Sequence, residues 1–283
     1  MKDIIKRSPK ENKTNLAKKL GISRGMLYYQ HKQPLVDEKI KTKIKDVLSN
    51  HHAYGYKRIA IELQLNKKRI LRVMKVFDIK PYIRRIKKPR KLEDEGKPKS
   101  LFKNEIENFC PVKPNIVWVG DFTYIYFAGQ FYYLATVMDL FTREVVGWSF
   151  SACHSKELVI EAFQNVVNNT DKIPVYFHSD QGSEYDSNDY LTLIKTYGVI
   201  ISMSRKSSPW ENGYQESFYS NFKLELGDPE RFENIGELIE AISLALRYYN
   251  HDRIHTKLKT SPIKYRLNYE QKHGEYLFKE MGT

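Results

Sequence analysis

Residues 116–150 read IVWVGDFTYIYFAGQFYYLATVMDLFTREVVGWSF. Three runs in this stretch are rich in Val, Ile, Tyr, Phe and Trp, side chains that favour the pleated conformation of a strand. The runs are 116–127, 131–140 and 144–150, and the breaks at 128–130 and 142–143 are suited to hairpin turns. The stretch therefore predicts three consecutive antiparallel strands.

Helical and strand segments alternate after the third strand. Helices are expected at 155–167 and 189–197, each followed by a short strand, at 175–177 and 199–203. Longer helices are expected at 212–226 and 235–250, the second with a capping box formed by Asn234 and Glu237. Together with the three antiparallel strands, these elements predict an α/β fold, a mixed five-stranded sheet with helices on its faces.

The N-terminal third is expected to be helical. Ala17, Gly21 and Leu27 match the helix-turn-helix pattern: a small residue at the helix contact, a glycine in the turn and an apolar anchor on the second helix. Arg24 would then begin the recognition helix and lie near DNA. An ordinary helical hairpin is the alternative. A second helical unit follows, and Asn66 is expected to N-cap its last helix.

Positive charge is concentrated in the first 100 residues. The formal net charge is +13, but residues 1–100 hold 29 lysines and arginines against 10 aspartates and glutamates, and the remaining 183 residues carry −6. A basic arm on a near-neutral body indicates a polyanion-binding module, with a merely solvated basic surface as the alternative. The cations expected to contact a DNA backbone are Lys67, Lys68, Arg69, Arg72, Arg84 and Arg85.

Composition excludes several classes of protein. Cys110 and Cys153 form no CxxC pair, so a zinc cage is not expected, and buried free thiols suit a reducing cytoplasm. The sequence has no apolar N-terminal signal and no run near 18 apolar residues, so neither export nor a membrane-spanning helix is expected. A GxxxxGK[ST] motif is also absent, which argues against a P-loop ATPase.

Three carboxylates occupy positions where an acid is costly or directed to a cleft. Asp121 interrupts an apolar strand, and a buried carboxylate needs a cation or several donors. Asp180 ends the strand Tyr176-Phe-His-Ser-Asp, and groups at strand ends in α/β sheets reach a cleft. Glu216 lies on a polar helix face with Asn212, Ser220 and Lys223, opposite Phe218, Phe222 and Leu226.

The chemistry of this set indicates a metal. Each carboxylate alone would be an ordinary salt-bridge or capping residue, but behind a basic arm the three together predict one site. Hard oxygen donors without a Cys or His set suit Mg²⁺ or Mn²⁺ rather than zinc. Two such ions, about 3.5–4 Å apart, activate an attacking oxygen and stabilise the leaving one in phosphoryl displacement.

Residues 111–270 resemble the retroviral-integrase-like core of DDE transposases, specifically the second-frame (OrfB-type) insertion-sequence transposases. The matching segments lie at 118–124, 139–148, 178–185, 208–218, 222–225 and 249–255, and 35 residues separate Asp180 from Glu216, the interval familiar in the family. The segment 52–59 also resembles the helical module that precedes this core. Two departures are Glu211, where the family often has Asp, and Gly213, where Ala is usual and where glycine weakens the helix start.

The resemblance implies a ribonuclease-H-like fold with Asp121, Asp180 and Glu216 as catalytic metal ligands. It implies a transposase that cleaves double-stranded DNA at the terminal inverted repeats of a mobile element and transfers the freed 3′-hydroxyl to a target. It further implies a homo-oligomer on DNA, in some cases with the product of an upstream frame, in the prokaryotic cytoplasm at the nucleoid. A nuclease of the same fold and a catalytically inactive DNA-binding regulator are the alternatives.

The expected domain boundaries follow from these patterns. A helical DNA-binding region covers 1–80, with units at 13–31 and 37–78, and a basic linker covers 81–108. The integrase-like core covers 109–272, and a tail covers 273–283.

Residues near the carboxylates are assigned more modest roles. Asp139 is expected to hold a turn with Arg143, Glu225 to be structural, and Glu184 and Asp186 to be solvated loop acids. His178 either orients Asp180 or is structural. Lys223 is expected at the rim of the site as a cation for a phosphate, and Asn212 is also expected to contact DNA. Arg253 and His255 either cap helices or touch DNA.

Overall fold

The computed structural model describes residues 12–28, 33–82, 102–107, 109–170, 172–204 and 213–281. Arg84, Arg85 and Asn212, three of the residues expected to contact DNA, lie outside the described residues. None of the described helices is both long and apolar enough to cross a lipid bilayer.

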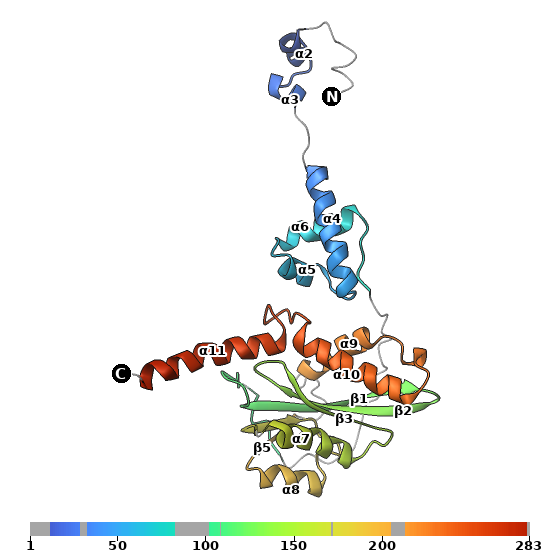
Figure 1. Cartoon of the computed structure of the whole chain (residues 1–283), viewed down its shortest axis with the longest axis vertical. Helices are drawn as coiled ribbons and strands as arrows, with labels where there is room; N and C mark the ends of the chain where they lie inside the picture. Colours follow the sequence, from blue (N-terminus) through green and yellow to red (C-terminus); the bar gives the residue numbers. More distant parts are fainter. Residues whose placement is uncertain are drawn as a thin grey trace.

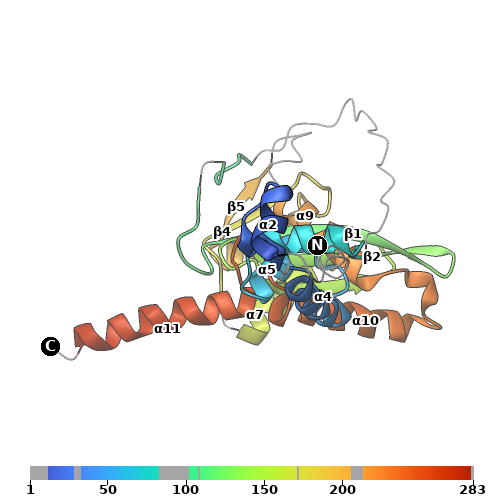
Figure 2. The same cartoon turned by 90° about the horizontal axis from the view of Figure 1, so that it is seen from above.

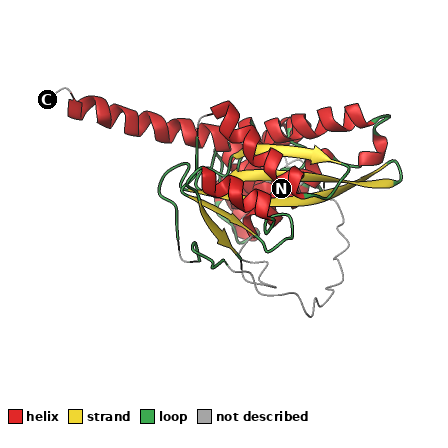
Figure 3. Ribbon diagram, turned by 90° about the horizontal axis from the view of Figure 1, so that it is seen from below, coloured by secondary structure: helices red, strands yellow, loops and turns green. Residues whose placement is uncertain are grey.

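A mixed sheet of five strands, in the order β3-β2-β1-β4-β5, forms the centre of the core (Figures 1 and 3). β1 (Val117–Phe127), β2 (Gln130–Asp139) and β3 (Val145–Ser151) are antiparallel. β4 (Tyr176–Ser179) runs parallel to β1, and β5 (Ile200–Met203) runs parallel to β4. The β1–β2 turn has positive φ at both Ala128 and Gly129, which suits the twist of a two-residue hairpin. The predicted ribonuclease-H-like sheet is confirmed.

Helices cover both faces of this sheet (Figure 1). On one face α9 (Gly213–Leu226) and α10 (Ile235–His251) pack against Val117 and Val119 of β1. On the other face α7 (Lys156–Thr170) and α8 (Asn188–Thr196) pack against Trp118 and Phe177. The alternation along β1 divides its side chains between the two clusters, as expected for a strand buried on both faces. At Gly120 a Cβ atom would lie 2.6 Å from the Phe177 ring, so a side chain does not fit there.

The N-terminal region is helical, as predicted. α2 (Lys13–Lys19) and α3 (Arg24–Tyr28) are separated by Gly21, whose φ of 62° is the left-handed conformation that glycine tolerates. Ala17 and Leu27 are buried together in the small cluster formed by these two helices.

A second helical unit packs on the core. It comprises α4 (Gln33–Asn50), α5 (Tyr56–Glu62) and α6 (Lys67–Val76), and Asn66 caps α6 through the Lys68 N–H at 2.8 Å. The Tyr54 hydroxyl accepts a hydrogen bond from the Ile254 N–H at 2.7 Å, and Arg58 Nε donates to the Ile254 carbonyl at 3.0 Å. Ile254 itself belongs to the apolar cluster of this unit, so the loop after α10 joins the unit to the core.

The C-terminal part differs from the expectation. A 3₁₀ turn (Pro229–Arg231) and α10 are followed by a twenty-residue helix, α11 (Pro262–Met281), that the sequence patterns did not predict. Figures 1 and 2 show α11 extending away from the sheet. Its first turns are held to the core by Arg266, which ion-pairs with Glu144 at 2.7 Å.

The cysteine expectation was wrong in one respect. Cys110 and Cys153 are free thiols, but both are exposed because they lie in the loops before β1 and after β3.

Candidate active site

Asp121 and Asp180 lie side by side on adjacent parallel strands. The register pairs Val119 of β1 with His178 of β4. Two residues further along each chain, Asp121 is level with Asp180, the first residue after β4. Residues at the same level of parallel strands, which are about 4.8 Å apart, direct their side chains to the same face. Both carboxylates are half-buried: Asp121 lies inside β1, and Asp180 directly follows the carboxyl end of β4.

Glu216 lies in the first turn of α9, on the same face of the sheet. Its neighbour Gln215 is fully buried and donates to the Val119 carbonyl at 2.7 Å. One turn later the Tyr219 hydroxyl donates to the Asp121 carbonyl at 2.6 Å. These two hydrogen bonds fasten α9 to the backbone of β1 around Asp121. Glu216 itself is exposed to solvent.

The charges of the three carboxylates are coupled. Burial raises the pKa of Asp121 to about 8, and the negative charges of Asp180 and Glu216 contribute, while the Phe122 N–H opposes the shift. Burial also raises the pKa of Asp180, and Glu184 adds to this, whereas the Gly182 N–H and His154 lower it. Without a cation Asp121 therefore holds a proton at neutral pH, and a divalent ion would displace that proton.

Glu184 was expected to be a solvated loop acid, and the structure shows otherwise. It is buried and ion-pairs with His154 Nδ1 at 3.3 Å. A Cβ atom on Gly182 would lie 2.9 Å from a Glu184 oxygen and 3.1 Å from Asp180 Oδ1, so only glycine leaves these two carboxylates their space. Asp186 is exposed, as predicted.

Asp121, Asp180 and Glu216 offer only carboxylate oxygens to a metal ion. Within the described parts of the chain, no three His, Cys, Asp or Glu side chains are arranged closely enough to hold an ion. Glu216 is exposed, whereas Asp121 and Asp180 are half-buried. The raised pKa values of Asp121 and Asp180 and the all-oxygen chemistry fit Mg²⁺ or Mn²⁺.

Lys223 lies two turns of α9 after Glu216 and is half-buried. Its Nζ atom lies 4.5 Å from the centre of the Tyr124 ring in β1. The lysine is therefore placed against the β1–β2 hairpin, beside the open edge of β1 beyond Asp121.

The basic residues of the helical units divide into two kinds. Arg24, Lys67, Lys68 and Arg69 are exposed. Arg72 instead forms a bidentate pair with the buried carboxylate of Asp37, at 2.7 and 2.6 Å. This contact joins α6 to α4, so the guanidinium expected to contact DNA already has a structural partner.

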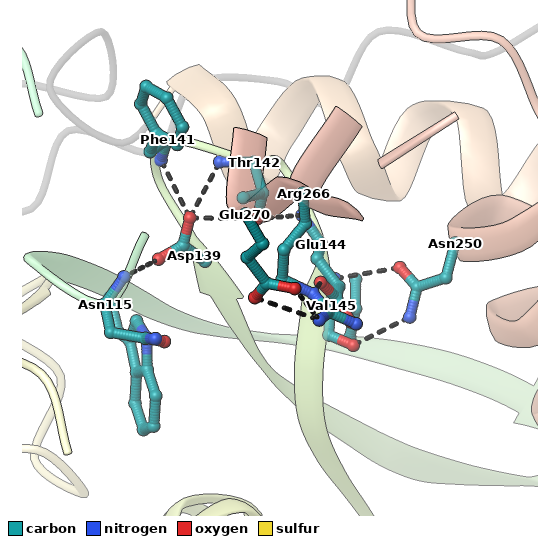
Figure 4. A network of polar contacts seen from close by, with 10 residues as sticks. Asn115, Asp139, Phe141, Thr142, Glu144, Val145, Asn250, Arg266 and Glu270 are labelled. Carbon is teal, nitrogen blue, oxygen red and sulfur yellow. Dashed lines mark hydrogen bonds and ion pairs between the residues drawn. The ribbon is translucent and has the colours of Figure 1, made fainter. Parts of the chain in front are cut away.

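Asp139 holds the β2–β3 turn, as predicted, but not through the Arg143 side chain. Its carboxylate accepts hydrogen bonds from the N–H groups of Asn115, Phe141 and Thr142 (Figure 4). The Arg143 guanidinium lies instead over the Tyr214 ring, 4.0 Å from its centre.

Three further neighbours have structural contacts. Glu225 ion-pairs with the buried Arg253 at 3.1 Å, which confirms its structural role and gives Arg253 one as well. His178 is buried and its Nδ1 lies 2.9 Å from the Ser202 hydroxyl.

Gln215 and Tyr219 were not singled out from the sequence. The sequence feature that could have identified them is their spacing of four residues, which places both on the strand-facing side of α9, next to Glu216. A polar side chain on that side has to find a partner, and here the partners are backbone carbonyls.

Comparisons with known proteins agree with this architecture. Residues 111–209 and 197–262 each match an integrase core domain family. InsK of insertion sequence element IS150 in Escherichia coli (strain K12) is 33% identical over 260 residues, covering 87% of this chain and 90% of InsK. The transposase for insertion sequence element IS904 in Lactococcus lactis is 34% identical, covering 80% of this chain and 92% of that protein.

A solved structure is also similar. The HTLV-2 integrase catalytic core domain, in complex with magnesium, matches with 20% identity and a TM-score of 0.46, covering 55% of this chain and 98% of that domain. The two bacterial transposases match over 90% and 92% of their own lengths. The chain therefore belongs to the insertion-sequence transposases with an integrase core domain, a family of polynucleotidyl transferases that act on DNA.

Proposed function

We propose that this transposase cleaves DNA at the ends of its element and joins the freed 3′-hydroxyl to a target strand, with Asp121, Asp180 and Glu216 as its catalytic carboxylates. The observation that supports this most is the register of β1 and β4, which sets Asp121 level with Asp180. Glu216 is held on the same face by the hydrogen bonds of Gln215 and Tyr219.

The three carboxylates would hold two Mg²⁺ or Mn²⁺ ions. When bound, these ions lower the pKa of the attacking hydroxyl or water and neutralise charge on the phosphate and the leaving oxygen. Transesterification conserves the energy of the phosphodiester bond, so no nucleotide cofactor is needed. The chain's part is to keep Asp121 and Asp180 side by side and to bring Glu216 to them from α9. The Gly182 N–H, 3.0 Å from Asp180 Oδ1, fixes the orientation of that carboxylate.

The basic arm would supply the DNA contacts that position the substrate. Arg24 in α3 and the exposed cluster Lys67, Lys68 and Arg69 in α6 are the proposed phosphate contacts of the described residues. Lys223 is proposed to reach a phosphate at the rim of the carboxylate site. The proposed partners are the double-stranded element ends and target, further copies of this chain, and the product of an upstream frame.

Cleavage and strand transfer of a labelled element end test the assignment. Asp121→Asn, Asp180→Asn and Glu216→Gln should each abolish both reactions while DNA affinity stays at the wild-type level. Asp186→Asn, an exposed carboxylate of the same loop, is the matched control and should be fully active. Full activity in EDTA or in any of the three variants contradicts the assignment. Hydrolysis without joined products would instead favour a nuclease.

A further inference from the structure

A second polar site lies on another side of α9. A cavity of about 530 Å³ opens between α5, the β2–β3 turn, the first turns of α9 and the loop after α10. Four cationic side chains line it: Arg58, Arg143, Arg253 and Lys257. Its apolar lining comes from Met138, Phe218 and Tyr249. We call this cavity the arginine pocket. Its size is that of a site for a small organic ligand.

The arginine pocket is separate from the carboxylates. Tyr214, Ser217, Phe218 and Asn221 line it from α9, at the spacing of one helical stripe. Glu216 lies outside that stripe, and Asp121 and Asp180 do not line the cavity.

Arg143 provides the main evidence that the arginine pocket binds a ligand. The residue is 6% exposed, and its Nη1 atom is buried with no hydrogen-bond partner among the described residues. A buried guanidinium N–H without a partner is costly, so such a group in a cavity indicates a missing acceptor. The guanidinium stacks on Tyr214, which is itself 45% exposed, and this holds its plane at the cavity wall.

The backbone at Arg143 adds to the cost of keeping this side chain here. Its φ is 64°, in the left-handed region that favours glycine or asparagine. The turn that carries it is fixed on both sides, by Asp139 and by the pair of hydrogen bonds between Asn250 and Val145 (Figure 4). A strained arginine on a rigid turn is typical of a residue retained for its side chain.

The potential in the arginine pocket is strongly positive. Burial, followed by Arg143, Arg253 and Arg58, lowers the pKa of His255 to about 4. Burial and the charge of Arg253 lower the pKa of Arg58 to about 10. Arg253 has Glu225 as a counter-ion, whereas Arg58 Nε donates to the neutral Ile254 carbonyl. His255 Nδ1 is a second buried atom without a hydrogen-bond partner in the described part of the chain.

We propose that the arginine pocket binds a phosphate group, with Arg143 as its principal ligand and a nucleotide of the bound DNA as its source. Guanidinium groups match a phosphate in geometry and charge, and the N-terminus of α9 in the cavity wall favours an anion. The apolar lining suits the sugar or base attached to that phosphate. Because Arg58 belongs to the helical unit, the bound phosphate would bridge the arm and the catalytic core.

The DNA part of this inference rests on the proposed function, so two probes are used. The first is inorganic phosphate at constant ionic strength, monitored by the thermal transition of the full chain. The second is a labelled DNA end in EDTA, with affinity measured as a function of salt. Neither probe requires catalysis, so failure here is distinguishable from failure of the carboxylate assignment.

Arg143→Asn removes the charge and keeps a residue that tolerates the left-handed backbone. Lys257→Gln, at an exposed position of the pocket, is the second variant in case the first does not fold. Lys195→Gln, an exposed lysine of α8 on the opposite face of the sheet, is the matched control. Phosphate should raise the transition temperature of the wild type and of the control. It should raise the transition temperature of the two pocket variants less, or not at all.

For DNA, Arg143→Asn should lower affinity about tenfold and reduce the slope of log affinity against log salt by about 0.7–0.9, the value for one phosphate contact. Phosphate stabilisation without any change in DNA affinity would retain the phosphate site but overturn DNA as its source. If both pocket variants match Lys195→Gln with both probes, the proposal is overturned.

Discussion

Replacing Asp121 with Asn should stabilise the metal-free protein, in a way that depends on pH. Asn has nearly the same shape and keeps the acceptor for the Phe122 N–H, which lies 2.8 Å from Asp121 Oδ1. What it removes is a carboxylate whose ionisation the folded protein resists, because burial and the charges of Asp180 and Glu216 oppose it.

The size of this stabilisation follows from the raised pKa of Asp121. A rise from 3.8 to about 8 makes ionised Asp121 a destabilising group in the folded state. Below pH 4 both folded and unfolded chains hold the proton, so the group costs nothing. The free energy of unfolding falls as pH rises from about 4 to 8, by about 1.4 kcal/mol per unit, or up to about 4 kcal/mol at pH 7. Asp121 is only partly buried, so screening by solvent roughly halves this loss of unfolding free energy, to about 2 kcal/mol.

Thermal unfolding of the full chain in EDTA, from pH 5 to pH 8.5, measures the effect. The transition of Asp121→Asn should lie above that of the wild type by roughly 4–8 °C at pH 7. The difference should shrink toward pH 5 and grow toward pH 8.5. Adding Mn²⁺ should reverse the order, because a divalent ion stabilises the wild type and lacks one ligand in the variant.

Asp186→Asn, an exposed position in the loop after Asp180, controls for a general change in net charge. If Asp121→Asn is no more stable than the wild type at pH 8, or if the difference is the same at pH 5 and pH 8, the electrostatic account of Asp121 is wrong.

Three further predictions concern catalysis and DNA contacts. Glu216→Gln should eliminate cleavage but leave folding intact, since the side chain is exposed; a large fall in the transition temperature would show a structural role instead. Replacing Lys67, Lys68 and Arg69 together with Gln should weaken binding to all DNA sequences alike and lower the salt slope by about 0.9 for each lost phosphate contact. An unchanged salt slope would show that the DNA does not contact these three residues of α6. Lys223→Ala should weaken binding of cleaved ends and strand transfer about fivefold, or about 1 kcal/mol, and wild-type strand transfer at moderate salt would contradict a phosphate contact of this lysine.

The strands and most helices of the core could be predicted from local patterns. The alternation of β1 and the aromatic and β-branched runs of β2 and β3 located those strands to within two residues. The same patterns located Asp180 at a strand end. α11 was not predicted, and its first turns are held by a contact between Arg266 and Glu144, which are distant in sequence.

The partners of single polar residues were predicted less well than the strands and helices. Asp139 is bonded within its own turn and was interpreted correctly. The pairing of Arg72 with Asp37 was not anticipated, because Asp37 lies 35 residues earlier, on another helix, and the expected DNA contact of Arg72 stays a prediction. Glu184 was expected in solvent, but its burial depends on His154, which follows β3. A charged side chain is exposed by default, and only the tertiary structure supplies the counter-ion that allows it to be buried.

The attachment of α9 explains how the proposed site keeps its geometry without a metal. Gln215 and Tyr219 donate to the carbonyls of Val119 and Asp121, which are backbone atoms that no substitution in β1 removes. The position of Glu216 along β1 is thus fixed by the strand itself, and only its side chain remains to turn toward Asp121. Tyr214 and Ser217 of the same helix line the arginine pocket. α9 therefore carries both the proposed catalytic glutamate and part of the wall of the cavity around Arg143.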